Sequence, residues 1–296
     1  MYDFVIIGGG TAGLSSAVYA CRANKKTLVI ERESFGGQIV DAPVVENYPG
    51  IMNISGAQFA SDLYDQAEHA GAEFTCETVE RIVKEGNTAT VITDGGRYPT
   101  KAVIIAAGCE HRRLGAPREE ELIGCGVSYC ALCDGAFFKD KVVAVVGGGN
   151  AAFTDALYLA GVASLVYIIH RRDAFRAEQT LVDRAKTLNN VRILTNARVG
   201  SLNGDDGLAS VTLDVAGEKK TIELDGLFVA VGRQPDNGAF GVALDDSGYI
   251  IADEHCRTNI KGIYAAGDCR AKTVRQLTTA AADGAVAVQT AIAELF

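Results

Sequence analysis

The fold is decided by the stretch Phe4-Val5-Ile6-Ile7-Gly8-Gly9-Gly10-Thr11-Ala12-Gly13 and by its second copy, Val142-Val143-Ala144-Val145-Val146-Gly147-Gly148-Gly149-Asn150-Ala151-Ala152. In each copy a short apolar run precedes a glycine-rich turn. A helix-like stretch follows, over 14–23 in the first copy and to about 161 in the second, and a further apolar run closes each copy, at 27–30 and 165–169. Strand, glycine turn, helix and strand in this order form the βαβ unit of a dinucleotide-binding sheet.

Other segments rich in Val, Ile and Thr predict antiparallel strands inserted into this α/β framework. They are 73–93, 97–107, 191–194, 209–215 and 220–224. The run 227–232 predicts a buried strand, and 262–268 predicts a strand that leads into a turn. The Ala-rich segment from Thr278 onward predicts a helix. We therefore expect an α/β fold with two Rossmann-like dinucleotide-binding domains, each with inserted antiparallel strands.

Composition and charge narrow the class of protein. A chain of 296 residues is long enough for two domains, and 48% apolar with 22% charged residues is typical of a globular protein. The net charge of −9 argues against a nucleic-acid binder, which needs a basic face. No run of eighteen apolar residues predicts a membrane span. Because a strand-like run begins at Tyr2, no room is left for a signal peptide, and we expect a cytoplasmic location.

The first glycine turn has the spacing of a dinucleotide site. Gly8 allows the tight turn, Gly10 lets the backbone reach a pyrophosphate at the helix N-terminus, and Gly13 allows close packing of helix on strand. Glu31, at the end of the next strand, is placed to accept hydrogen bonds from ribose hydroxyls. These residues favour FAD, which has no 2′-phosphate, over the alternative of a plain strand–helix turn.

The second glycine turn is followed by basic residues instead of a carboxylate. Its strand ends in His170-Arg171-Arg172, and Arg176 follows. A carboxylate at this position would repel a ribose 2′-phosphate, whereas arginines bind it with charge-assisted hydrogen bonds. The cluster therefore predicts an NADPH site, with a solvated basic patch as the alternative.

Two of the eight cysteines, Cys130 and Cys133, are separated by only two residues. This spacing fits a reversible disulfide at the start of a helix, where the positive helix end lowers the pKa of a thiol. It is also half of a zinc site, but no second such pair and no paired histidines accompany it. Buried unreactive thiols are a further alternative. Asp134 is either a proton donor in disulfide exchange or a helix cap.

The chain resembles the low-molecular-weight, bacterial-type thioredoxin reductases of the pyridine nucleotide-disulfide oxidoreductase family over nearly its whole length. Four stretches carry the resemblance: Gly36-Gly37-Gln38 with Val45-Glu46-Asn47-Tyr48-Pro49-Gly50; Val127-Ser128-Tyr129-Cys130-Ala131-Leu132-Cys133-Asp134-Gly135; His170-Arg171-Arg172-Asp173-Ala174-Phe175-Arg176-Ala177-Glu178; and Ala265-Ala266-Gly267-Asp268 with Arg275-Gln276-Leu277.

The resemblance implies how the chain is divided and which residues bind cofactors. Residues 1–110 and 240–296 are expected to form an FAD-binding domain, and 111–239 an NADPH-binding domain that holds the redox-active cysteines. Asp268 is expected to hold the ribityl chain, and the backbone near Gln276 and Leu277 to face the flavin. The expected FAD residues are Gly8, Gly10, Thr11, Ala12, Gly13, Glu31, Arg32, Gly37, Gln38, Asn47, Gly108, Gly267, Asp268, Arg275, Gln276 and Leu277. The expected NADPH residues are Gly147, Gly149, Asn150, Ala151, Ala152, His170, Arg171, Arg172 and Arg176.

The resemblance also implies an activity. A thioredoxin-disulfide reductase passes hydride from NADPH to FAD, then electrons to the disulfide and to thioredoxin or a thioredoxin-like protein. By the same resemblance Cys133 meets the flavin, Cys130 attacks the partner disulfide and Asp134 supplies the proton. One domain rotates against the other, and the protein is expected to be a homodimer. No metal is expected.

Three positions depart from the family pattern. Ala107 replaces a usual Thr, and Leu132 replaces a frequent Thr. After Asn150 the family often has Thr-Ala and then two acidic residues, where this chain has Ala151-Ala152-Phe153-Thr154-Asp155. The main alternative is therefore a ferredoxin-dependent flavin thioredoxin reductase or a dithiol oxidase that does not use NADPH. A flavin- or nucleotide-binding sensor and a ferredoxin–NADP reductase-like enzyme are further alternatives. The intact arginine motif favours NADPH.

Overall fold

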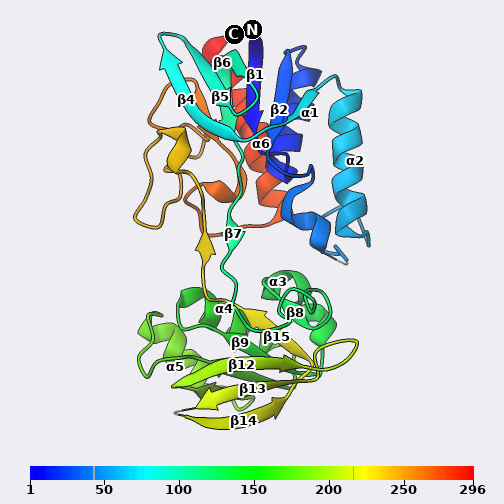
Figure 1. The fold of residues 1–296 in the computed structure, drawn as a ribbon, viewed down its shortest axis with the longest axis vertical. Helices are drawn as coiled ribbons and strands as arrows, with labels where there is room; N and C mark the ends of the chain where they lie inside the picture. Colours follow the sequence, from blue (N-terminus) through cyan, green and yellow to red (C-terminus); the bar gives the residue numbers. More distant parts are fainter. Residues whose placement is uncertain (43, 216) are drawn as a thin grey trace. The chain divides into compact units, whose positions relative to one another are not determined.

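The structure is a computed structural model that describes residues 1–42, 44–215 and 217–296. The chain forms two compact units (Figure 1). Unit 1 consists of Met1–Glu110 and Gln234–Phe296, and unit 2 of His111–Arg233. The chain crosses between the units twice, and strands β7 (Glu110–His111) and β16 (Arg233–Gln234) at the two crossings form a two-stranded sheet. The second crossing lies six residues before the boundary expected from the sequence.

Unit 1 is built on a mixed seven-stranded sheet of order β3-β2-β1-β6-β5-β4, with β17 also paired to β6. Its strands are β1 (Tyr2–Ile7), β2 (Thr27–Glu31), β3 (Glu73–Cys76), β4 (Val79–Glu85), β5 (Thr88–Thr93), β6 (Arg97–Ile105) and β17 (Ile263–Ala265). The strands β3, β2, β1, β6 and β17 pair in parallel, whereas β4, β5 and β6 pair antiparallel.

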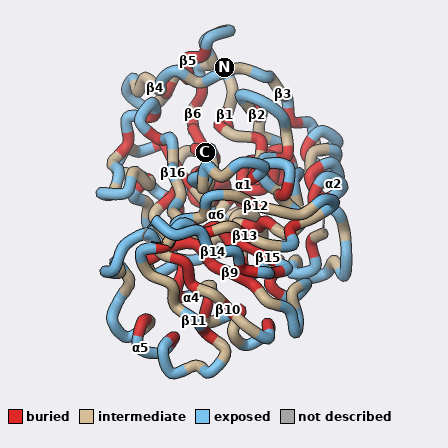
Figure 2. The backbone as a smooth tube through the Cα atoms, turned by 60° about the horizontal axis from the view of Figure 1, so that its bottom comes forward, coloured by how far each residue is buried: buried red, intermediate tan, exposed pale blue. Residues whose placement is uncertain are grey.

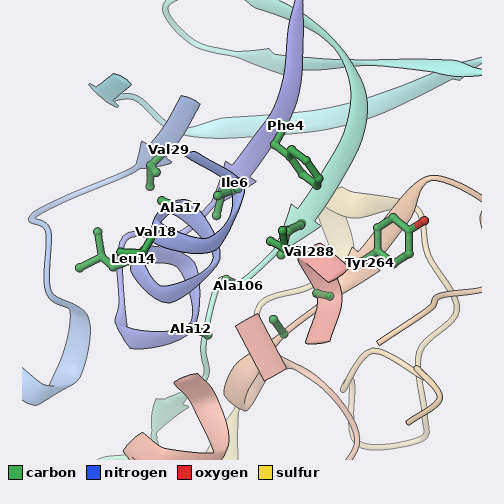
Figure 3. Packing of buried hydrophobic residues seen from close by; sticks show 14 of the residues in the cluster. Phe4, Ile6, Ala12, Leu14, Ala17, Val18, Val29, Ala106, Tyr264 and Val288 are labelled. Atoms are coloured by element: carbon green, nitrogen blue, oxygen red, sulfur yellow. The ribbon is translucent and has the colours of Figure 1, made fainter. Parts of the chain in front are cut away.

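Both faces of this sheet are buried. On one face Phe4 and Ile6 of β1 belong to a core with Leu14 of α1 (Thr11–Arg22) and Val288 of α6 (Leu277–Leu295) (Figure 3). On the other face the alternate β1 residues Val5 and Ile7 belong to a second core. Unit 1 has one further α-helix, α2 (Gly56–His69), among the described residues. It begins after Ser55, whose hydroxyl accepts a hydrogen bond from the Gln58 amide. Short 3-10 helices lie at Gly37–Asp41, Gly238–Phe240 and Gly267–Cys269.

Unit 2 holds a five-stranded parallel sheet, β11-β10-β9-β15-β8, and a three-stranded antiparallel sheet, β12-β13-β14. Its elements are β8 (Val127–Ser128), α3 (Ala131–Asp134), the 3-10 helix η2 (Gly135–Phe138), β9 (Val142–Val146), α4 (Asn150–Leu159), β10 (Leu165–Ile169), α5 (Gln179–Thr187), β11 (Val191–Leu194), β12 (Ala197–Asn203), β13 (Ser210–Val215), β14 (Glu218–Glu223) and β15 (Gly226–Val229). Buried residues concentrate in the strands of the parallel sheets, such as β6 and β9 (Figure 2).

The two βαβ units and the α/β class are confirmed, but the directions expected for three strands were wrong. The strand β6, expected to be antiparallel, pairs in parallel with β1 and β17 and antiparallel only with β5. The strand β3 pairs in parallel with β2, and β11 pairs in parallel with β10, so each extends a dinucleotide-binding sheet. Antiparallel pairing had been expected for both, because an apolar pattern does not encode strand direction. None of the helices formed by the described residues is long and apolar enough to span a membrane.

Candidate redox and dinucleotide sites

The first glycine turn has contacts that only glycine permits. Gly8 has φ +103°, and a Cβ there would lie 2.3 Å from the Ala106 carbonyl oxygen. A Cβ on Gly13 would lie 1.9 Å from the Gly8 carbonyl oxygen. The turn therefore brings β1 directly into α1, and the free amides of the first helical turn suit an anionic phosphate.

Glu31 is held beside this turn by backbone amides. Its Oε2 accepts a hydrogen bond of 2.7 Å from the Gly9 amide, and its Oε1 accepts one of 2.8 Å from the Arg32 amide. Oε1 accepts a second hydrogen bond of 3.2 Å from the Glu33 amide, whereas Oε2 keeps a lone pair for a further donor. Arg32 forms an ion pair with Glu110. A pocket opens here, lined by Gly8, Glu31, Arg32, Gly108, Cys109 and Phe240 among others.

Other residues expected at FAD lie against the same turn. The Gly36 amide donates a 2.8 Å hydrogen bond to the Gly9 carbonyl, and a Cβ on Gly37 would lie 3.1 Å from Gly10 Cα. The Gln38 side chain donates a hydrogen bond to the Cys109 carbonyl oxygen. The segment 36–38 is thereby fixed over the glycine turn.

The C-terminal residues expected at FAD lie around the start of α6. The Gln276 side-chain oxygen accepts a hydrogen bond of 3.3 Å from Nδ2 of the Asn47 side chain, and Gln276 caps α6 together with Thr279. Arg275 donates to the Asp268 carbonyl oxygen at 3.3 Å. Its guanidinium lies 4.1 Å from the centre of the Tyr249 ring. Asn47 and Gln276, which are far apart in the sequence, therefore meet in unit 1.

A buried charge cluster, which the sequence analysis missed, lies behind Gly267. Asp283 of α6 accepts hydrogen bonds from the Gly267 amide at 3.0 Å, from Arg270 at 2.8 Å and from Lys272 at 2.9 Å. The side chains of Arg270, Lys272 and Asp283 are only 11%, 13% and 15% exposed. The neighbouring Gly284 lets α6 approach α1, since a Cβ there would lie 2.4 Å from the Ala12 carbonyl oxygen. No local sequence pattern signals such a cluster.

The second glycine turn is packed against the basic segment. A Cβ on Gly148 would lie 2.2 Å from the His170 ring, and the Arg176 amide donates a 2.8 Å hydrogen bond to the Gly148 carbonyl. Asn150 exchanges two hydrogen bonds with Glu178, of 2.8 and 3.0 Å. The exposed residues Arg171, Arg172 and Arg176 form no ion pair with any residue that the structure describes. Their guanidinium groups thus remain available to an anion beside the turn.

Burial lowers the pKa of His170, and the three neighbouring arginines add to this effect. The His170 ring is therefore expected to be neutral at pH 7. Its Nε2 lies 3.1 Å from the Ala174 carbonyl oxygen, which fixes the loop.

Asp155 of α4 is a second titratable group of unit 2. Burial raises the pKa of Asp155 to about 6, although the Arg233 charge acts in the opposite direction.

The redox pair forms a disulfide in unit 2. The Cα atoms of Cys130 and Cys133 lie 5.3 Å apart, and the Cys133 amide donates a 3.1 Å hydrogen bond to Cys130 Sγ at the start of α3. Cys133 is exposed and Cys130 is half-buried. The described residues include no group of three or more His, Cys, Asp or Glu placed to hold a metal ion.

Asp134 ends α3 and is linked to Ser128. Ser128 Oγ donates a 2.6 Å hydrogen bond to Asp134 Oδ2 and accepts one of 3.0 Å from the Cys130 amide. Burial raises the pKa of Asp134, and the hydrogen bond from Ser128 partly offsets that rise. The pKa of this carboxyl, next in sequence to Cys133, is thus above the ordinary value for an aspartate.

Two exposed apolar side chains flank the disulfide. Leu132 lies between the cysteines and is 51% exposed, and Phe137 of η2 is 42% exposed.

The remaining cysteines are separate thiols. Cys21, Cys109, Cys256 and Cys269 are buried, whereas Cys76 and Cys125 are exposed. Burial raises the pKa of Cys256 to about 11 and that of Cys269 to about 12. These two thiols are therefore protonated and unreactive at neutral pH.

Comparison with known proteins identifies relatives over the whole chain. The model of the family described as pyridine nucleotide-disulphide oxidoreductase matches residues 2–284. A thioredoxin reductase of Listeria monocytogenes is 45% identical, and the alignment covers 98% of this chain and 93% of that protein. A thioredoxin reductase of Treponema pallidum is 43% identical over 98% of this chain and 96% of its own.

A solved structure gives the same result for the fold. The crystal structure of thioredoxin reductase from Streptococcus pyogenes superposes with a TM-score of 0.95 at 40% identity. The alignment covers 99% of this chain and 97% of that chain.

Proposed function

Because this chain belongs to the pyridine nucleotide-disulphide oxidoreductases, and among them to the thioredoxin reductases, we propose that it reduces the disulfide of thioredoxin or a thioredoxin-like protein with electrons from NADPH. The observation that carries the proposal is the Cys130–Cys133 disulfide, built into the same unit as an arginine-flanked glycine turn. Unit 1 then serves as the FAD-binding domain and unit 2 as the NADPH-binding domain.

The residues of unit 1 fit FAD. The close approaches at Gly8 and Gly13 bring backbone amides to the place of a pyrophosphate, and Glu31 Oε2 retains an acceptor for a ribose hydroxyl. Asp268, Arg275, Gln276 and Leu277 would hold the flavin end. When bound, FAD and NADPH would supply a two-electron relay that ends at the disulfide.

The residues of unit 2 fit NADPH. Gly147, Gly149 and Asn150 would bind the pyrophosphate at the start of α4. Arg171, Arg172 and Arg176 would bind the 2′-phosphate, because their exposed guanidinium groups have no competing ion pair within the described residues. This pairing of charges is the physical basis for NADPH as the donor.

Once the cysteine pair is reduced, its chemistry is thiol–disulfide exchange. The Cys130 thiolate attacks one sulfur of the partner disulfide, and the other partner sulfur leaves as a thiolate that takes a proton from Asp134. The Cys133 thiolate then attacks Cys130 Sγ, which re-forms the Cys130–Cys133 disulfide and releases the second partner thiolate. Two electrons thereby pass to the partner. Leu132 and Phe137 are placed to contact the partner during this exchange.

The assembly proposed for this chain is a homodimer. Unit 1 has an apolar groove lined by side chains of α1, α2 and α6 and by the segment 48–49, and Tyr19 beside it is 45% exposed. A second copy of the chain is the occupant that we propose for this groove. Tyr19→Asp should shift the sedimentation coefficient to that of a monomer, and an unchanged dimer would rule out this interface.

The cytoplasm is the compartment that we propose for the enzyme. Six cysteines lie outside the disulfide, and two of them, Cys76 and Cys125, are exposed. Exposed thiols persist in a reducing compartment.

The decisive experiment is anaerobic stopped-flow reduction of the purified flavoprotein by NADPH, followed at the oxidised flavin band. We expect fast bleaching that consumes two hydride equivalents per subunit, because the flavin and the disulfide each accept two electrons. The double variant Cys130→Ser, Cys133→Ser should consume one equivalent. Negligible bleaching by NADPH, together with rapid reduction by ferredoxin or a free dithiol, would instead support the alternative that does not use NADPH.

A further inference from the structure

The hydroxyl group of Ser128 is hydrogen-bonded both to the Asp134 carboxyl and to the backbone of Cys130. Ser128 ends β8, which pairs with β15 at the edge of the parallel sheet, and its residue is only 5% exposed. Its Oγ contacts Asp134 Oδ2 at 2.6 Å, the Cys130 amide at 3.0 Å and the Cys130 carbonyl oxygen at 3.4 Å. A hydroxyl has a single proton, so the shortest contact identifies Asp134 as the acceptor.

The two hydrogen bonds act on different groups. The hydroxyl proton stabilises the ionised form of Asp134, because a charge-assisted hydrogen bond favours the carboxylate. The hydroxyl oxygen accepts from the Cys130 amide and so fixes the backbone at the first residue before α3. A single atom of β8, Ser128 Oγ, therefore holds both the Asp134 carboxyl and the Cys130 backbone.

Few other side chains on the elements packed against α3 carry a charge or a titratable group that could act on Asp134. The helix α3 packs against η2 and α4. The titratable side chains of α4 are Asp155 and Tyr158, and a Cβ on Gly135 would lie 2.8 Å from the Tyr158 ring. The 3-10 helix η2 has no charged residue, and the two cysteines are joined in the disulfide. Burial raises the pKa of Asp134, and Ser128 is the side chain that lowers it.

We propose that Ser128 is a positioning residue of the disulfide site, whose hydroxyl holds the Asp134 carboxyl beside Cys133 in the orientation from which the carboxyl exchanges its proton with the partner thiolate. This inference rests on the proposed function for the identity of the partner. The contact between Ser128 and Asp134 does not depend on that function.

The test compares the holoenzyme with Ser128→Ala and Ser128→Thr. Infrared difference spectra recorded across a pH titration follow the protonated carboxyl band of Asp134, which is identified by its loss in Asp134→Asn. In Ser128→Ala the midpoint of this band should move to higher pH by at least about half a unit, because burial is then opposed by no hydroxyl donor. Ser128→Thr retains a hydroxyl and should keep the midpoint near that of the wild type.

The matched control is Ser164→Ala, which removes a hydroxyl that donates to the Lys141 carbonyl oxygen elsewhere in unit 2. It should leave the Asp134 midpoint unchanged. Thioredoxin reduction by Ser128→Ala should show the same shift in its pH profile, with an unchanged KM for thioredoxin. An unshifted carboxyl band in Ser128→Ala would overturn the inference. A shifted band in Ser128→Ala, together with a wild-type enzyme that fails to reduce thioredoxin, would instead contradict the proposed function and leave the contact of Ser128 with Asp134 intact.

Discussion

Arg171 and Arg172 directly follow β10 and His170, in the segment that packs on the second glycine turn. We expect Arg171→Ala with Arg172→Ala to raise the KM for NADPH by at least about tenfold, because charge-assisted contacts to a phosphate are lost. The KM for NADH should change little, since NADH has no 2′-phosphate. Steady-state kinetics with both donors measures this difference.

A suitable control is Arg184→Ala, which removes an exposed arginine on α5 of the same unit. This variant should leave the KM for NADPH and the KM for NADH unchanged. Equal losses for NADPH and NADH in the double variant would show that these arginines do not bind the 2′-phosphate.

Asp155 predicts a pH-dependent stability. Burial raises the pKa of Asp155 in the folded chain to about 6 from an ordinary value of 3.8. The folded state therefore binds this proton more tightly, and the ionised carboxylate destabilises it above pH 6. Asp155→Asn should raise the free energy of unfolding at pH 8 by about 2–3 kcal/mol, and the gain should disappear below about pH 4.

Denaturant unfolding of the wild type and Asp155→Asn at pH 8 and pH 4 measures this effect. Asp183→Asn on the surface of α5 is the control, since Asp183 is exposed. A gain of equal size at both pH values would mean that the stabilisation comes from packing and not from the charge.

At the scale of elements, the close contact between α1 and α6 depends on a glycine, Gly284. Gly284→Ala would place a methyl group 2.4 Å from the Ala12 carbonyl oxygen, so the two helices must separate. We expect a loss of about 1–3 kcal/mol in the free energy of unfolding. FAD should also bind more weakly, because α1 begins at the first glycine turn and α6 at Gln276.

Denaturant unfolding and the release of FAD, followed by flavin fluorescence, test this prediction. Val286→Ala on the exposed side of α6 is the control, and it should leave FAD binding unchanged. Wild-type affinity in Gly284→Ala would show that the helix contact does not influence the cofactor site.

The elements differ in how far the sequence predicts them. The two βαβ units are predictable because the glycine turns and apolar runs are local patterns. The helix α2 was missed, although Ser55 and Gln58 have the spacing of a capping box and Phe59, Leu63 and Ala67 follow at helical intervals. The signal was present, but no element was assigned to the segment between Gly50 and Glu73, which contains α2.

The residues of the redox and dinucleotide sites also differ in how far the sequence predicts them. The cysteine pair and the arginine cluster are contiguous in sequence and were predicted from it. The contacts of Asn47 with Gln276 and of Asp283 with Gly267 join separate segments. Such contacts depend on the packing of α6 and on strand order, neither of which a periodic pattern determines.

At the scale of the whole molecule, each unit has its own cores. The cores of unit 1 combine residues such as Phe4 and Val5 with Tyr264 and Ile263, whereas those of unit 2 draw only on 111–233. A ligand that binds one unit should therefore stabilise that unit selectively. Removing FAD should speed amide hydrogen exchange in peptides from 1–110 and 234–296 and change those from 111–233 little.

Exchange measured by mass spectrometry on the holoenzyme and the FAD-free protein tests this. Adenosine 2′,5′-diphosphate is the converse probe, since it carries the 2′-phosphate and should protect peptides of 111–233. Equal acceleration throughout the chain after FAD removal would show that the two units unfold together.

The interrupted course of unit 1 has a consequence for how the protein is made. A ribosome adds residues in order, so 1–110 is synthesised long before 234–296. The early segment then has the strands β1 and β6 but lacks β17, which pairs with β6, and α6, which covers one apolar face of the sheet. Unit 2 is continuous and is complete first, so it can fold during translation while the nascent sheet of unit 1 remains exposed. The nascent chain should therefore recruit chaperones at the strands of 1–110 until α6 has emerged.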